Sequence, residues 1–183
     1  MEAISAIILA GGKSSRMGQD KGLMLLDGKP MIQHVVDTVK PIVSEIIIVA
    51  NNTSYQSFGN KFYVDEVKNS GPLAGLCVGL KHSETHLNIV LSCDVPYVTT
   101  EMLEVLIKEF SQQTDVVLFE KQEELHPLIA LYSKTCLPLL QSFLKENELK
   151  LKYVLNHLNI NKIDGTSYAE KCFKNINTPK DFL

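Results

Sequence analysis

A glycine-rich, basic segment follows the first apolar run of the chain and reads LAGGKSSRMGQDKG. Glycines directly after a buried strand let the backbone approach a ligand closely and direct its N–H groups outward. Lys13, Arg16 and Lys21 then add three positive charges within nine positions. Because backbone donors combined with flexible cations suit a polyphosphate, the segment predicts an anion site. The alternative is a solvated turn between a strand and a helix, in which Gly11 and Gly12 serve geometry alone.

An aspartate ends another apolar run, in the segment LSCDVP. A carboxylate at the carboxyl end of a central strand, followed by a proline that fixes the turn, is well placed to bind a hard divalent cation. Mg²⁺ usually takes one or two carboxylates together with phosphate oxygens and water, so Asp94 alone would suffice if a nucleotide supplies the rest. The alternative is a carboxylate that only caps a helix or fixes a turn.

An acid beside a glycine-rich helix start could form the wall of a base pocket. Asp65 precedes EVKNSGPLAG, and its carboxylate could accept hydrogen bonds from the N1–H and N2–H₂ groups of guanine. The plain alternatives are a turn residue at Asp65 and a helix whose small residues permit close packing.

Several common catalytic and nucleotide-binding patterns are missing. Neither GxxxxGK[ST] nor GxGxxG occurs, and no GxSxG elbow supplies a nucleophile. His126, in ELHPLIALY, therefore lacks the partners of a general base. We interpret it as a contact to a second substrate or as a structural hydrogen-bond donor.

The totals describe an ordinary globular chain of 183 residues, with 18 basic and 21 acidic side chains and a net charge of −3. Such a balance disfavours bulk electrostatic capture of nucleic acid, so any anion site must be local. The first apolar run is too short for an export signal or a membrane span, and no membrane partner is expected. No cysteine pair has CxxC spacing, which favours reduced, buried thiols in a cytoplasmic protein over a disulfide frame or a zinc site. The cysteines are Cys77, Cys93, Cys136 and Cys172.

The apolar runs predict the strands that must position these residues. Strands are expected where β-branched or apolar runs stop at glycine or polar residues. The main ones cover residues 3–10, 44–50, 61–64, 87–93, 115–119 and 127–132, and shorter ones lie near 162–164 and 172–175. A small hairpin is expected over 21–30, turning at Asp27-Gly28.

Helices are predicted where a proline or threonine precedes an apolar stripe at helical spacing. They cover residues 30–41, a segment from 71 onward, 99 or 100 through 110, and about 137–146 and 150–157, with another helix start at 178–181. Strands that alternate with helices and are apolar throughout indicate a mostly parallel sheet covered on both faces. We therefore expect a single-domain, Rossmann-like α/β/α fold over residues 1–183. Its ligands should lie beyond the carboxyl ends of the strands, at the switch point.

Five segments in this order resemble one known family: LAGGKSSRMGQDKGL, GPLAG, LSCDVP, HPLIALY and NINTPKD. They are similar to the molybdenum cofactor guanylyltransferase family, the MobA type, and the resemblance covers nearly the whole chain. The broader pattern LAGGxSxRMGxDK is typical of nucleotidyltransferases that activate sugars, polyols and cofactors with NTPs.

The resemblance implies a role for each matching residue. Arg16 and Lys21 would reach the phosphates of GTP, and Asp94 would bind Mg²⁺. Asn175 and Asn177, with His126, would lie near the second substrate, which is molybdopterin carrying molybdenum. The remaining GTP contacts would be Leu9, Ala10, Gly11, Gly12, Asn52 (or Asn51), Asp65 and the segment from Gly71 to Gly75.

The implied reaction transfers GMP from GTP to the terminal phosphate of the molybdenum-bearing molybdopterin and releases pyrophosphate. That phosphate is already ionised at neutral pH, so the missing catalytic triad is expected. Other cofactor-biosynthesis proteins and acceptor molybdoenzymes would be partners. Three alternatives stay open: a cytidylyltransferase for the same cofactor, a sugar-phosphate nucleotidyltransferase, and a non-catalytic nucleotide or molybdopterin carrier.

Overall fold

The computed structural model describes residues 2–11, 20–65 and 71–176. Seven strands form one sheet in the order β5-β4-β1-β6-β8-β7-β9. The strands are β1 (Ile4–Leu9), β4 (Glu45–Val49), β5 (Lys61–Tyr63), β6 (Leu87–Ser92), β7 (Val116–Lys121), β8 (Glu124–Ser133) and β9 (Ile160–Asp164). Only β8 runs antiparallel to its neighbours within this sheet. The predicted mostly parallel sheet is thereby confirmed.

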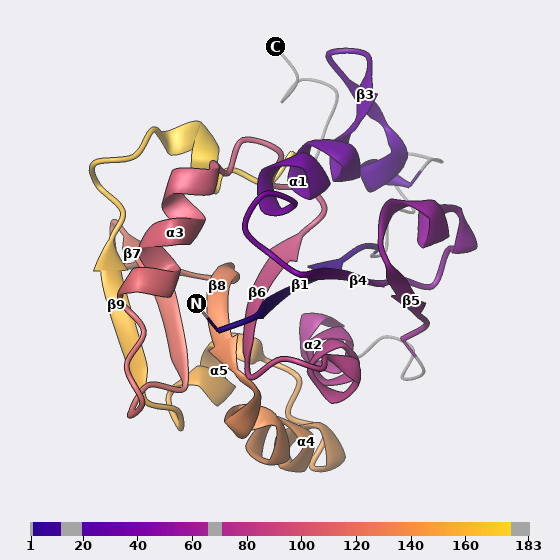
Figure 1. Ribbon diagram of the computed structural model, residues 1–183. Coiled ribbons are helices and arrows are strands. Elements are labelled where there is room, and N and C mark those ends of the chain that lie inside the picture. The colour runs from indigo at the N-terminus through magenta and orange to yellow at the C-terminus, as the bar shows by residue number, and fades with distance from the viewer. Residues whose placement is uncertain (1, 12–19, 66–70, 177–183) are drawn as a thin grey trace.

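Helices cover both faces of the sheet, which explains why its central strands are mostly apolar on both faces. Helices α1 (Met31–Val39) and α3 (Thr100–Lys108) lie on one face (Figure 1). Helices α2 (Gly71–His82), α4 (Leu137–Lys145) and α5 (Leu151–Leu155) lie on the other. Each face carries its own core, and β1 is buried along its whole length between the two cores. The α/β/α layering matches the prediction.

The sequence signals for the helix starts act as expected. The hydroxyl of Thr99 accepts a hydrogen bond from the backbone N–H of Met102 and so caps α3. Gly71, with a φ of +62°, begins α2. Farther along this helix, a Cβ added to Gly79 would lie 2.4 Å from Ile7, so α2 packs unusually close to β1.

The predicted small hairpin is present, as β2 (Leu25–Leu26) and β3 (Lys29–Pro30). Asp27 and Gly28 form its turn with φ values of 51° and 77°, a conformation that favours these two residue types. The described residues also form four short 3₁₀ helices, which the sequence patterns do not predict. They are η1 (Lys21–Leu23), η2 (Thr53–Phe58), η3 (Lys134–Cys136) and η4 (Glu170–Phe173).

Two regions differ from the expectation. Strands β7 and β8 form a hairpin through Gln122 and Glu123, whose φ values are 51° and 63°. The strand predicted at 127–132 is present in β8, but the turn before it has no glycine or asparagine and so carries no sequence signal for a hairpin or for the antiparallel direction of the strand. The strand predicted at 172–175 is wrong, because Cys172 and Phe173 lie in η4 and are buried in the core against the sheet. The helix start predicted at 178–181 lies outside the described residues.

Register brings the ends of four parallel strands to the same edge of the sheet. Leu9 of β1 is paired with Val49 of β4 and with Ser92 of β6, and Val49 is paired with Tyr63 of β5. We call this side the carboxyl edge and the opposite side the amino edge. The strand order reverses between β1 and β6, and a ligand is expected to bind outside the carboxyl ends of the strands at this switch point.

Candidate active site

The segment after β1 begins at the centre of the carboxyl edge. Leu9 and Ala10 are buried, and the backbone N–H of Ala10 donates to the carbonyl of Val49 over 2.9 Å. Gly11 then adopts a φ of +103° with open space around its Cα, a conformation that strains any other residue. Gly12, Lys13 and Arg16, the rest of the predicted anion site, lie outside the described residues.

Asp94 lies beside this segment, just beyond β6. The backbone N–H of Cys93 donates to the carbonyl of Leu9 over 3.0 Å, which ties the two strand ends together. The hydroxyl of Ser92 donates to Oδ1 of Asp94 over 2.5 Å and so orients the half-buried carboxylate. The structure therefore places Asp94, the predicted metal ligand, next to Leu9, where the predicted phosphate-binding segment begins.

Lys21 and Asn52 are brought together by an aspartate that sequence reasoning did not select. Asp20 precedes η1, which starts at Lys21. Its Oδ2 accepts a hydrogen bond from Nδ2 of Asn52 over 3.3 Å, and its Oδ1 accepts one from the hydroxyl of Tyr55. Asn52 also caps η2 by accepting from the backbone N–H of Ser54. The two contacts to Asp20 join residues that are 32 and 35 positions apart, so no local sequence pattern reveals them.

The predicted base-pocket residues divide into two groups. Asp65 follows the edge strand β5 and lies close enough to Cys77 of α2 to raise the pKa of that thiol, although burial is the larger cause. Gly71 is exposed at the start of α2. Gly75 is buried, and a Cβ there would lie 3.2 Å from Leu9. Gly75 therefore matches the close-packing alternative, whereas Asp65 and Gly71 remain candidates for the pocket wall.

The described residues that are predicted to contact the second substrate also lie near this edge, but they come from β8 and from the tail. His126 is paired with Phe119 beyond the carboxyl end of β6, and its ring lies 4.6 Å from that of Phe173. Burial lowers the pKa of His126 below its usual value, so the imidazole is neutral at pH 7. The tail then passes the exposed Asn175, and the backbone N–H of Ile176 donates to the carbonyl of Asp94 over 2.9 Å. Asn177 lies outside the described residues.

The donor set fits a metal ion that is shared with a nucleotide. Across residues 2–11, 20–65 and 71–176, no group of three or more His, Cys, Asp or Glu side chains could hold a metal by itself. Asp94 offers a single oriented carboxylate at the switch point. That arrangement suits Mg²⁺, which keeps several waters and takes its other ligands from phosphates.

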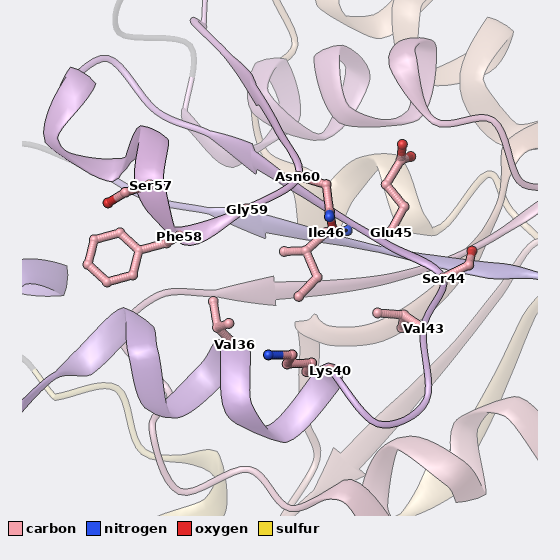
Figure 2. A pocket seen from close by; sticks show the side chains of 10 residues that line it. All are labelled: Val36, Lys40, Val43, Ser44, Glu45, Ile46, Ser57, Phe58, Gly59 and Asn60. Carbon is pink, nitrogen blue, oxygen red and sulfur yellow. Dashed lines mark hydrogen bonds between the residues drawn. The ribbon is translucent and has the colours of Figure 1, made fainter.

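A hollow of about 410 Å³ lies elsewhere (Figure 2). Its lining comes from the end of α1, the start of β4 and the turn before β5, and includes Lys40, Glu45 and Asn60. Since β4 and β5 both begin there, the hollow belongs to the amino edge. None of the residues that line it is one of the predicted site residues.

Comparison with known proteins shows the class of this chain. Residues 6–160 match the family model described as "MobA-like NTP transferase domain". The matching solved structures include the molybdopterin-guanine dinucleotide biosynthesis protein A of Archaeoglobus fulgidus. It aligns with a TM-score of 0.81 and 25% identity, over 97% of this chain and 94% of that one. Fold and family model thus define a nucleotidyltransferase.

Curated relatives narrow the class to one family. The "Molybdenum cofactor guanylyltransferase" of Vibrio campbellii is 36% identical over 181 residues, covering 97% of this chain and 92% of the relative. A Flavobacterium johnsoniae protein named "Probable molybdenum cofactor guanylyltransferase" is 39% identical over 155 residues, covering 85% and 82%. The chain belongs to the molybdenum cofactor guanylyltransferase family, as its motifs suggest. Within the described ranges, no helix is long and apolar enough to cross a membrane.

Proposed function

We propose that this chain transfers GMP from GTP to the terminal phosphate of molybdenum-molybdopterin and releases pyrophosphate. The observation that carries the proposal is the convergence of the predicted nucleotide and metal residues on one sheet edge. Lys21, Asn52, Asp65 and Asp94 come from four separate segments, yet all follow parallel strands around the switch point. The named activity of the relatives supplies the substrates.

The proposed GTP site uses backbone and side chains in different roles. The segment from Leu9 to Gly12 lines the triphosphate, while Lys21 and Arg16 neutralise charge on the phosphates. Asn52 and Asp65 hold the nucleoside, and the start of α2 at Gly71 flanks the guanine. Each role suits the chemistry of the group, since cations pair with phosphate oxygens and a carboxylate accepts from guanine N–H donors.

The reaction needs no nucleophile from the protein. An ionised oxygen of the molybdopterin phosphate attacks the α-phosphorus of GTP, the new P–O bond forms in line, and the bond to the β-phosphate oxygen breaks. Pyrophosphate leaves with the electron pair, so the task of the site is positioning and charge neutralisation. Asp94 would hold Mg²⁺, which when bound stabilises negative charge on the phosphate oxygens.

The second substrate would bind between the tail and the β7–β8 hairpin. Asn175 and Asn177 would contact it from the tail, and a neutral His126 could offer one hydrogen-bond donor and one acceptor. As part of the proposal, the chain works as one domain in the cytoplasm. Its four cysteines are free and buried, which suits a reducing compartment. Delivery and acceptor proteins of the cofactor pathway would be its partners.

A transfer assay tests the proposal directly. We expect GTP labelled at the α-phosphate to give a labelled molybdopterin dinucleotide and one equivalent of pyrophosphate when molybdenum-molybdopterin and Mg²⁺ are present. CTP, ATP and sugar phosphates serve as controls for base and acceptor. Faster transfer from CTP would identify the protein as a cytidylyltransferase. Transfer to a sugar phosphate would identify it as a sugar-phosphate nucleotidyltransferase. Tight GTP binding without product would indicate a carrier and overturn the proposal.

A further inference from the structure

We propose that Tyr55 is a positioning residue of this site, whose hydroxyl holds the Lys21 segment against the ends of β1 and β6. The expected effect of Tyr55 on catalysis rests on the proposed function. Its positioning of the Lys21 segment rests only on contacts within the fold. Tyr55 lies in η2, away from the motifs that mark the family in the sequence. Tyr55 contacts neither substrate in the proposed reaction, so its effect on catalysis would come through the position of Lys21.

The hydroxyl of Tyr55 lies where several segments of the carboxyl edge meet. It donates a hydrogen bond to Oδ1 of Asp20, the residue directly before Lys21. The thiol of Cys93 lies close to the same hydroxyl, since both groups flank Gly22. A single hydroxyl thus links η2 and the loop before Lys21 with the residue that precedes Asp94.

The packing around this hydroxyl leaves no space for a side chain at position 22. A Cβ added to Gly22 would lie 2.5 Å from the hydroxyl oxygen of Tyr55 and 2.8 Å from the sulfur of Cys93. Gly22 is therefore required for η1 to approach the two side chains. Since η1 contains both Lys21 and Gly22, this close contact sets the distance of the Lys21 backbone from β6.

Burial explains why a hydroxyl here has more than a packing role. Tyr55 is 0% exposed and packs in the core that the sheet shares with α1 and α3. A phenylalanine would fill the same space without burying a polar group, which costs free energy unless it is hydrogen-bonded. The hydroxyl therefore contributes through its partners. Asp20 uses its second carboxylate oxygen for Asn52, so the same network orders the proposed nucleoside contact.

The first test measures positioning without any activity. In Tyr55→Phe, amide hydrogen exchange in peptides covering residues 20–26 should become several-fold faster than in the wild type. Tyr132→Phe is the matched control, since Tyr132 is also fully buried and donates its hydroxyl to the carbonyl of Pro127 over 3.0 Å. That variant should leave the exchange of residues 20–26 unchanged. Equal exchange in the wild type and Tyr55→Phe would overturn the inference whatever the enzyme does.

The second test asks whether Tyr55 acts through Lys21. With GTP, Mg²⁺ and molybdenum-molybdopterin, Tyr55→Phe should lower kcat about tenfold with little change in melting temperature. In a Lys21→Ala background the same substitution should have almost no further effect, because the group it positions is gone. Asp20→Asn, which keeps an acceptor oxygen, should restore part of the loss expected for Asp20→Ala.

The outcomes separate the two proposals. A wild-type protein without guanylyl transfer would overturn the proposed function, and the exchange test would still decide the positioning role. An active wild type with unchanged kcat in Tyr55→Phe would overturn the inference alone. Losses that multiply in the double variant would also overturn it, since they would mean that Tyr55 acts independently of Lys21.

Discussion

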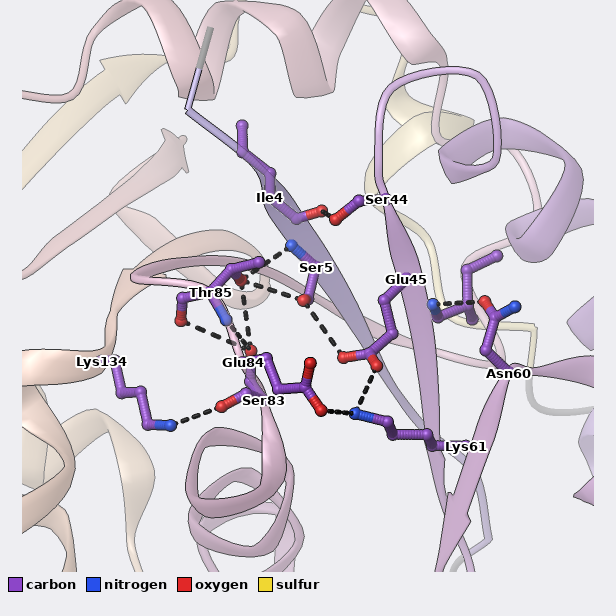
Figure 3. Close-up of polar contacts among 11 residues, drawn as sticks. Ile4, Ser5, Ser44, Glu45, Asn60, Lys61, Ser83, Glu84, Thr85 and Lys134 are labelled. Atoms are coloured by element: carbon purple, nitrogen blue, oxygen red, sulfur yellow. Dashed lines mark hydrogen bonds and ion pairs between the residues drawn. The ribbon is translucent and has the colours of Figure 1, made fainter.

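The two edges of the sheet both carry dense polar networks, but they hold their carboxylates differently. At the amino edge, Lys61 lies 2.6 Å from Glu45 and 2.6 Å from Glu84 (Figure 3). Ser5 and Thr85 link the starts of β1 and β6 beside this cluster, and the hydroxyl of Ser5 lies 3.4 Å from Glu45. At this edge both glutamates are paired with a lysine of the fold.

At the carboxyl edge, the donors that the structure shows for two carboxylates are neutral. Asp94 accepts from the hydroxyl of Ser92, and Asp20 accepts from the Tyr55 hydroxyl and the Asn52 amide. Neutral donors orient a carboxylate without removing its negative charge. The cluster at the amino edge thus pairs its carboxylates with a lysine of the fold, whereas the two carboxylates at the carboxyl edge are oriented by neutral groups and keep their charge for a ligand.

Removing the Asp94 carboxylate should have the largest effect. Asp94→Ala takes away the proposed metal ligand, and we expect kcat for guanylyl transfer to fall by about 10²–10³-fold, as for other lost groups that stabilise a transition state. Asp164→Ala is the matched control, because Asp164 also ends a strand, β9, but binds Thr166 locally. Turnover that survives Asp94→Ala would refute the metal assignment.

Removing the Lys21 ammonium should have the next largest effect. We expect Lys21→Ala to lower kcat/KM for GTP by about 10–100-fold, because it removes one cation from the phosphates. Lys29→Ala tests a nearby lysine whose ammonium is paired with Asp37 at 2.6 Å on the surface. Steady-state kinetics should show no change for Lys29→Ala, and equal losses in the two variants would point to general electrostatics instead.

Adding a side chain at Gly22, the residue after Lys21, should lower both the stability of the fold and the rate of turnover. Gly22→Ala places a Cβ against Tyr55 and Cys93, and we expect a loss of about 1–3 kcal/mol in the free energy of unfolding. Denaturant titration measures it. Gly28→Asn is the control, since Gly28 has open space around it and asparagine tolerates its φ of +77°. A neutral Gly22→Ala would show that η1 is not held closely.

The smallest effect is expected at the amino edge. Lys61→Met should leave guanylyl transfer unchanged and lower the melting temperature slightly. The hydrogen bond from Lys61 lowers the pKa of Glu84 below 4.5, so this contribution to stability is present above that pH and is lost as the pH falls through the folded-state pKa. The melting temperatures of the wild type and the variant should therefore converge in acid. A loss of turnover in Lys61→Met would contradict the division between the two edges.

Patterns of a few residues sufficed to predict most elements of this fold. Apolar runs located β1, β4 and β6, and the Asp27-Gly28 pair located the hairpin turn. These element predictions succeeded because the determining interactions lie within a few positions of one another in the sequence. Local chemistry also selected Asp94 as a candidate metal ligand, because a carboxylate at the carboxyl end of a central strand is well placed to bind a divalent cation, and that role stays a prediction.

The remaining features depend on contacts between distant segments. The Gln122–Glu123 turn uses residue types that seldom adopt positive φ, so tertiary pairing of β7 and β8 overrides local preference. Phe173 becomes buried against Phe119, which replaces the predicted strand with η4. The Asp20–Tyr55 contact joins residues 35 positions apart. Sequence reasoning therefore selected candidate ligand groups but missed the side chains that contact them.

One measurement tests the central claim most directly, a crystal structure of the protein with GTP and Mn²⁺ recorded at the manganese absorption edge. We expect an anomalous peak within coordination distance of the Asp94 carboxylate, bridging to the phosphates of a nucleotide that lies along Gly11 and Lys21. The guanine should lie near Asp65 and the start of α2. Manganese away from Asp94, or GTP bound in the hollow at the amino edge, would contradict the account.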